Sequence, residues 1–199
     1  MTLQVDDAGW GSLIGPVLIG VYRVETAEFA YREIPVECFQ GSAFARQEYL
    51  AAAVQAAQDA FVELRATPQE EVEACTGYVL QGVRDWLRRE GYAVEETAIR
   101  GPLQILVEMA LAQVLQQIGF LVDPAVLREN HGRAFFEALK WLKGGNLDAT
   151  RALPGRERWA KTGWNSYRTW IDHPYEQARQ LARQRKRPRC RLEPAYCRR

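Results

Sequence analysis

The chain of 199 residues lacks several features that would place it in a special class of protein. No stretch reaches the roughly 18 consecutive apolar residues of a membrane span, and the first segment carries an acidic pair instead of a basic and apolar leader. We therefore expect a cytoplasmic protein with no membrane partner. None of the four cysteines forms a Cys-x-x-Cys pair, so neither a zinc ribbon nor a disulfide framework is indicated.

A large net charge is also missing, because the whole chain carries only +1. This average hides an asymmetry: the segment from Gln177 to Arg199 holds nine basic residues against one acid, and the rest of the chain sums to −7. An acidic body with a basic tail is typical of proteins that bind polyphosphate without sequence specificity. A solvated terminus that has no partner is the alternative.

Hydrophobic residues make up 47% of the chain, which suffices for one α/β domain with a core and an appendage. Apolar alternation and turn residues predict strands and helices in the order βββαβαβα. The predicted strands are Leu3–Val5, Val17–Val24, Phe29–Phe39, Glu71–Thr76 and Ala93–Ile99. The predicted helices are Ala43–Leu64, Tyr78–Glu90 and Leu103–Ile118. This order indicates a mixed five-stranded sheet flanked by helices.

We divide the chain into a core of residues 1–122, a helical extension of residues 123–176 that completes the domain, and a basic tail of residues 177–199. Four of the six tryptophans fall in the extension, where they alternate with lysines and arginines. Rings that stack on bases and cations that neutralise phosphates are common in nucleic-acid-binding proteins. Core packing is the alternative for Trp141 and Trp159.

The residues that point to chemistry begin at the end of the first predicted strand, where Asp6 and Asp7 precede a glycine-rich turn. Adjacent carboxylates repel each other, and a divalent cation with oxygen ligands offsets that cost. The run Asp-Asp-Ala-Gly-Trp-Gly-Ser-Leu-Ile-Gly-Pro-Val that starts at Asp6 resembles the first motif of type-2 ribonuclease H. More broadly, it resembles the first hairpin of the ribonuclease H-like nuclease superfamily, whose fold has the same element order.

Two later segments are similar to type-1 ribonuclease H. The run Gln47–Val54 resembles that family's first helix, and the resemblance implies that Glu48 is the second acid of the site. The run Val72–Val83 resembles the fourth strand and the following helix, in which an Asp stands three residues before a Tyr-Val-x-Gln-Gly sequence. Cys75 occupies that position here.

The departure at Cys75 requires another source for the third acid. Glu73 is our prediction, since residues two apart on a strand share a face, and Glu71 is the alternative. If neither side chain reaches the site, the site has lost a carboxylate. For the fourth acid the resemblance implies a late helix, which favours Asp148 at the start of a short helical signal, with Glu108 as the alternative.

The resemblance implies a metal-dependent nuclease that hydrolyses phosphodiester bonds in nucleic acid by a two-metal mechanism, with Mg²⁺ or Mn²⁺ as cofactor. The expected catalytic residues are Asp6, Asp7, Glu48, Glu73 and Asp148, and all of these except Asp7 are expected metal ligands. The expected nucleic-acid contacts are Trp10, Lys140, Lys143, Arg156, Arg158, Lys161, Arg185, Lys186 and Arg187.

Trp10 replaces the arginine of the family's Gly-Arg-Gly turn, so an RNA–DNA hybrid, RNA and structured DNA all stay open as substrates. His131 lies in a Glu-Asn-His-Gly loop similar to the mobile histidine loop of some family members; an ordinary surface histidine is the alternative. A different function is also open, namely a non-catalytic nucleic-acid-binding or scaffold protein on a degenerate ribonuclease H-like fold.

Overall fold

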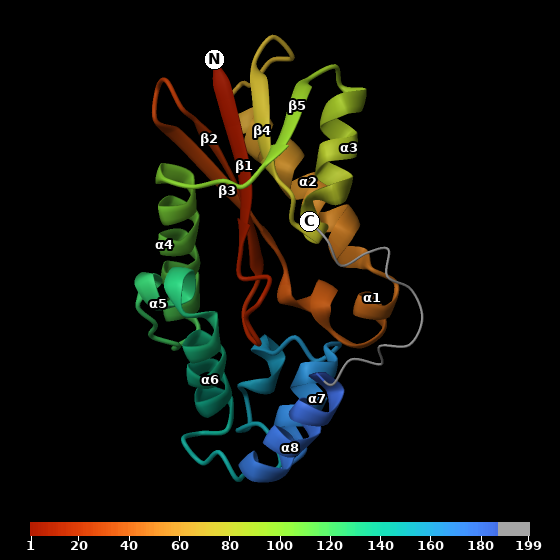
Figure 1. Cartoon of the computed structure of the whole chain (residues 1–199), viewed down its shortest axis with the longest axis vertical. Coiled ribbons are helices and arrows are strands. Elements are labelled where there is room, and N and C mark those ends of the chain that lie inside the picture. Colours follow the sequence, from red (N-terminus) through yellow and green to blue (C-terminus); the bar gives the residue numbers. More distant parts are fainter. Residues whose placement is uncertain (187–199) are drawn as a thin grey trace.

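A computed structural model describes residues 1–186 as a sheet with helices on both faces (Figure 1). The strands are β1 (Thr2–Ala8), β2 (Val17–Arg23), β3 (Glu28–Ile34), β4 (Glu71–Cys75) and β5 (Ala93–Thr97). Their order in the sheet is β3-β2-β1-β4-β5. The first three strands pair antiparallel, whereas β4 pairs parallel with both β1 and β5. This order and these directions are those of the ribonuclease H-like fold, which confirms the expected fold class.

The helices divide into two layers because side chains alternate along each strand. α2 (Glu48–Glu63) and α3 (Gln81–Arg89) cover the face of the sheet to which Leu3 and Val5 point. α4 (Pro102–Gln117) covers β1 and β2 on the opposite face, where it packs against Ala8. Each face therefore has its own hydrophobic core.

The predicted helix Ala43–Leu64 is two helices, so the prediction of one continuous helix is wrong. α1 (Gly41–Ala45) follows the short 3₁₀ helix η1 (Val36–Phe39), and α2 begins only at Glu48. Between them Gln47 adopts a left-handed backbone with a φ of 58°, and its side-chain amide donates to the Tyr78 hydroxyl at 3.2 Å. Glu48 consequently lies at the very start of α2.

The extension forms a helical unit that meets the α4 face of the sheet. Its elements are α5 (Pro124–Glu129), α6 (His131–Leu142), the 3₁₀ helix η3 (Glu157–Trp159), α7 (Asn165–Ile171) and α8 (Tyr175–Lys186). Leu139, Leu142 and Ile171 are almost completely buried in the same core as Leu103 and Leu111 of α4. The extension thus contributes to the core of the domain.

The segment around η3 returns to the first hairpin of the sheet. The amide of Gly15 donates to the carbonyl of Trp159 at 2.8 Å, and the amide of Lys161 donates to the carbonyl of Leu13 at 2.9 Å. The amide of Gly163 donates to the carbonyl of Phe39 at 3.0 Å. These backbone bonds join parts of the chain that are more than a hundred residues apart in sequence.

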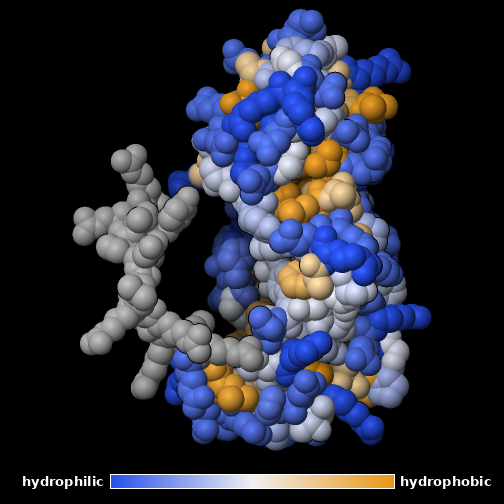
Figure 2. Space-filling view, turned by 90° about the vertical axis from the view of Figure 1, so that its right-hand side faces the viewer, coloured by the Kyte–Doolittle hydropathy of each residue, from blue (hydrophilic) through white to orange (hydrophobic). Residues whose placement is uncertain are grey.

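The surface near α2 and α3 is mostly hydrophilic, with apolar patches that are small and scattered (Figure 2). Val62 on α2 and Tyr78 in the 3₁₀ helix η2 (Tyr78–Leu80) are among the exposed large apolar residues. Within residues 1–186, no helix combines the length and the hydropathy needed to cross a bilayer.

A chain that ends after residue 122 should fail to fold cooperatively, because it leaves the apolar side of α4 without Leu139, Leu142 and Ile171. Thermal unfolding followed by circular dichroism, compared with the full chain, measures this. A sharp transition for the truncated chain would show that residues 1–122 form a domain without the extension.

Candidate functional site

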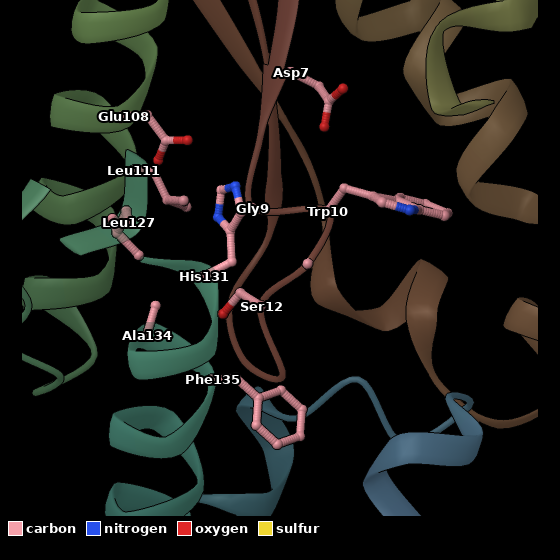
Figure 3. Close-up of a pocket in the computed structure, with 11 residues that line it drawn as sticks. Asp7, Gly9, Trp10, Ser12, Glu108, Leu111, Leu127, His131, Ala134 and Phe135 are labelled. Carbon is pink, nitrogen blue, oxygen red and sulfur yellow. The ribbon is translucent and has the colours of Figure 1, made fainter. Parts of the chain in front are cut away.

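A pocket of about 380 Å³ opens beyond the end of β1. Its walls come from the turn after β1, from α4 and from the start of α6 (Figure 3). Asp7 and Glu108 belong to its lining from β1 and α4, and His131 from the first residue of α6. Figure 3 shows Glu108 and His131 on one side of β1 and the Asp7 carboxylate turned to the other side. Segments from three distant parts of the sequence therefore contribute polar groups to one hollow.

The turn after β1 has a shape that requires glycine at its first position. Gly9 has a φ of +90°, and a Cβ atom there would lie 2.9 Å from the carbonyl oxygen of Pro16 and 3.2 Å from Leu111. Any side chain at this position would be strained and would clash with backbone. The turn is closed by the amide of Ser12, which donates to the carbonyl of Gly9 at 3.0 Å.

Asp6 and Asp7 occupy different environments. Both pair regularly with β2, opposite Gly20 and Ile19, so their side chains leave the strand on opposite faces. Asp6 is buried, and its carboxylate accepts hydrogen bonds from the Cys75 thiol and from the amide of Asp7. Asp7, and not Asp6, lines the pocket.

The three carboxylates at this end of the sheet are electrostatically strained. Burial and the charge of Asp6 raise the pKa of Asp7 to about 7. Burial, followed by the charges of Asp7 and Asp6, raises the pKa of Glu108 to about 7. Burial also raises the pKa of Asp6, although its two hydrogen bonds oppose this. Negative charge at this site is thus costly without a compensating cation.

Glu108 shows the strain most directly. Its side chain is buried, and its Oε2 atom is buried without any hydrogen-bond partner in the protein. A buried, unpartnered carboxylate oxygen is rare, because the unmet desolvation costs several kcal/mol. The protein itself therefore leaves the charge of Glu108 uncompensated at this oxygen.

The donor set suits one hard divalent cation. Mg²⁺ usually takes one or two protein carboxylates and completes its shell with water and substrate phosphate. Glu108 supplies one such carboxylate on the α4 face, and Asp7 lines the same pocket from the other face of β1. In the part of the chain that the structure describes, no group of three or more His, Cys, Asp and Glu side chains is arranged to hold a metal ion. The structure thus offers two carboxylates at the pocket and does not assemble four.

Lys161 places a cation behind Asp7. Its side chain is fully buried, and its Nζ atom donates to the carbonyl of Gly9 at 2.5 Å. The ammonium also lies 4.8 Å from the ring centre of Phe39 and 5.1 Å from that of Trp164, where the ring faces attract a cation. Burial lowers the pKa of Lys161 to about 7, against the opposing charge of Asp7. Lys161 is enclosed by protein and does not reach the pocket surface.

Trp10 lines the pocket, but its ring belongs to an aromatic cluster beside it. Its ring points away from Glu108 (Figure 3) and lies 5.4 to 6.1 Å from four other rings. These are the rings of Phe39, Tyr49, Tyr78 and Trp164. The cluster fixes the turn against the start of α2 and the segment before α7.

Three of the predicted acids lie outside the pocket. Glu48 is exposed at the start of α2, where it pairs with Arg46 at 2.7 Å. Glu73 on β4 accepts from the side-chain amide of Gln4 at 2.8 Å. Asp148 lies in a turn after α6, not at a helix start, and accepts from the amide of Tyr175 at 3.1 Å. Glu71, the alternative to Glu73, is exposed.

The predicted nucleic-acid contacts differ in their accessibility. Lys143 is buried and donates to the carbonyls of Leu147 and His173, so it has a structural role. Arg156 donates to the carbonyl of Trp141, and its guanidinium lies 4.7 Å from the centre of that ring.

Two of the other predicted contacts, Lys140 and Arg158, are exposed. Arg185 and Lys186 belong to the end of α8, where side chains are not described, and Arg187 lies outside the described residues.

Glu108 was only an alternative on the basis of sequence, although the chain contains a clear sign of its importance. It is the single charged residue of α4, whose other residues are apolar or glutamine apart from the initial proline. A lone acid on an otherwise uncharged, buried helix needs a partner or a ligand.

No protein-family model matches the chain, and no curated protein sequence matches it either. Among solved structures, the chain is similar to the catalytic core domain of BIV integrase, with 12% sequence identity and a TM-score of 0.36. The similarity covers 92% of this chain and 97% of that domain. The assignment of a ribonuclease H-like fold rests on the order and directions of the five strands.

The substitution Glu108→Gln should stabilise the metal-free protein at about pH 8 and change little at about pH 5. The pKa of Glu108 rises from its ordinary value of 4.5 to about 7 in the folded protein, so the folded protein holds this proton more tightly than the unfolded chain does. The resulting stabilisation is fully present below the lower pKa and is lost as the pH rises through the higher one. The neutral amide avoids this loss, which is on the order of 3 kcal/mol.

Urea unfolding in EDTA at the two pH values measures this effect. Glu73→Gln, outside the pocket, is the matched control and should show no such gain. Equal effects of the two substitutions at both pH values would contradict the assignment of the strained charge to Glu108.

Proposed function

We propose that this chain is a metal-dependent nuclease that hydrolyses phosphodiester bonds in nucleic acid. In this proposal Glu108 and Asp7 hold one Mg²⁺ or Mn²⁺ ion at the pocket; Asp6 lies on the same face of the sheet as Glu108, and Asp7 joins the lining from the end of β1. The observation that carries the proposal is the presence of two mutually repelling carboxylates in one pocket, one of them with an unpartnered oxygen.

The bound cation would activate the attacking water and neutralise charge on the phosphate. The protein contributes the orientation of its ligands. The Cys75 thiol of β4 donates to the Asp6 carboxylate of β1, and the Lys161 ammonium donates to the Gly9 carbonyl. These two bonds fix the strand end that carries Asp7. Gly77 allows this close packing, because a Cβ atom there would lie 3.0 Å from the Asp7 carboxylate.

Binding to the nucleic-acid backbone would draw on basic groups away from the pocket. Lys140 and Arg158 are exposed on the extension, and the sequence from Gln177 to Arg199 adds nine basic residues against one acid. Contacts of this kind neutralise phosphates and weaken as salt increases, without selecting a sequence.

A second candidate function is nucleic-acid binding without catalysis. It is favoured by the engagement of Glu48, Glu73 and Asp148 in bonds elsewhere and by the thiol of Cys75 in the place of the family's third acid. The two candidates differ in a single respect, which is whether a cation at Asp7 and Glu108 supports cleavage.

Cleavage of labelled RNA–DNA hybrid, single-stranded RNA, single-stranded DNA and a four-way junction in Mg²⁺ and Mn²⁺ distinguishes the two functions. We expect at least one substrate to be cut, and we expect Asp7→Asn and Glu108→Gln each to slow cleavage by about a hundredfold or more. The controls Glu73→Gln and Asp148→Asn should retain activity. Binding without cleavage in either metal would support the second function, and cleavage that survives both pocket substitutions would place the activity elsewhere.

Mg²⁺ should raise the melting temperature of the wild-type protein, and by more at about pH 8 than at about pH 5, because binding requires ionised carboxylates. Differential scanning fluorimetry with a Mg²⁺ titration measures this shift. The shift should disappear in Glu108→Gln and persist in Glu48→Gln. An equal Mg²⁺ effect on the two variants would argue against the pocket as the binding site.

A further inference from the structure

The pocket is chemically divided along its length. Asp7 and Glu108 lie at one end, Phe135 lies at the other, and His131 stands between them (Figure 3). Most of the remaining lining is apolar: Leu111 and Leu127 lie level with His131, and Ala134 and Phe135 lie beyond it (Figure 3). A cation and a phosphate need only the acidic end, which leaves the apolar end for a different chemical group.

The ring of Phe135 is held firmly in the pocket wall. It packs edge-on against Phe136, with 5.5 Å between ring centres, and against Trp170, with 5.9 Å. α6 is fixed at its start by Asn130, whose side chain accepts from the amide of Arg133 at 2.9 Å. A half-buried ring with a fixed orientation offers a face on which a planar group can stack at little entropic cost.

We propose that the apolar end of the pocket takes the base of an unpaired nucleotide whose phosphate lies at Asp7 and Glu108. This inference rests on the proposed nuclease function and adds the class of substrate to it. A nucleotide joins an anionic phosphate to a flat, largely apolar base, which matches the order of groups along the pocket. His131 and Ser12 lie between the two ends and offer hydrogen bonds to polar atoms of the nucleotide.

The pocket selects against paired DNA or RNA for a geometric reason. It is a hollow walled by a turn and three helices, and a base that stays stacked in a duplex cannot enter it. Extrusion of a paired base costs a few kcal/mol and costs least where the nucleotide is already unpaired. Single strands, bulges and junctions are therefore the favoured substrates.

Fluorescence anisotropy of the full chain with three labelled DNAs of related sequence tests the inference: a full duplex, a duplex with a one-nucleotide bulge, and a single strand. Ca²⁺ replaces Mg²⁺ so that the carboxylates have a hard cation. We expect the bulged and single-stranded DNAs to bind at least about tenfold more tightly than the duplex. Loss of one stacked base corresponds to a roughly fivefold to hundredfold change in affinity.

Two variants act on the apolar end, and one neighbour serves as the control. Phe135→Leu removes the stacking face, and Ala134→Leu fills the space beside it. Both should abolish most of the preference for unpaired DNA. Phe136→Leu should keep the preference, because Phe136 lies outside the pocket wall and packs on Trp170 and Tyr175. Melting temperatures of all three variants establish that each is folded.

Five outcomes would overturn the inference. Equal affinity for duplex and unpaired DNA would contradict it, and so would equal behaviour of Phe135→Leu and Phe136→Leu. A nucleoside monophosphate that competes as well as the single strand would reassign the apolar end to a free nucleotide. If the protein cleaves duplex DNA in an Asp7-dependent way and Phe135→Leu keeps the wild-type binding preference, this inference fails and the proposed nuclease function stands. If no nucleic acid binds at all, the proposed function fails with it.

Discussion

Negative charge buried at the carboxyl end of β1 constrains the structure around it. Three carboxylates from two elements lie near this end, and burial raises the pKa of each. The charge of Asp6 adds to the shift at Asp7, and the charges of Asp7 and Asp6 add to the shift at Glu108. Such an arrangement costs folding free energy when the groups ionise, and it persists in proteins mainly where function needs it. The unpartnered oxygen of Glu108 shows that the surrounding protein leaves part of this cost uncompensated.

The extension supplies a positive charge, that of Lys161, which partly compensates the negative charge of Asp7. Lys161 reaches under the first turn and donates to the Gly9 carbonyl, while the neighbouring backbone bonds to Leu13 and Phe39 hold its segment in place. This buried ammonium offsets part of the charge of Asp7 and not that of Glu108. The sheet and the extension are thus linked by electrostatics as well as by the core on the α4 face.

Much of the fold could be predicted from the sequence, because strand alternation and the breakers between elements are local signals. The site was harder to predict. The motif at Asp6 and Asp7 indicated the strand end at which a pocket opens, but which of the two side chains lies on the α4 face depends on a register that no local pattern encodes. Glu48 was expected inside a continuous helix, and the break at Gln47 depends on a contact with the distant Tyr78. Lys161 was expected on a basic surface and is buried, since its surroundings come from three separate segments.

The most direct measurement is a crystal structure of the protein soaked with Mn²⁺, with anomalous scattering recorded to locate the ion. The account predicts a single strong peak at the pocket, within coordination distance of carboxylate oxygens of both Asp7 and Glu108. A pocket without a peak, in crystals that show Mn²⁺ elsewhere, would contradict the account. So would a structure in which the Lys161 ammonium forms a direct ion pair with Glu108.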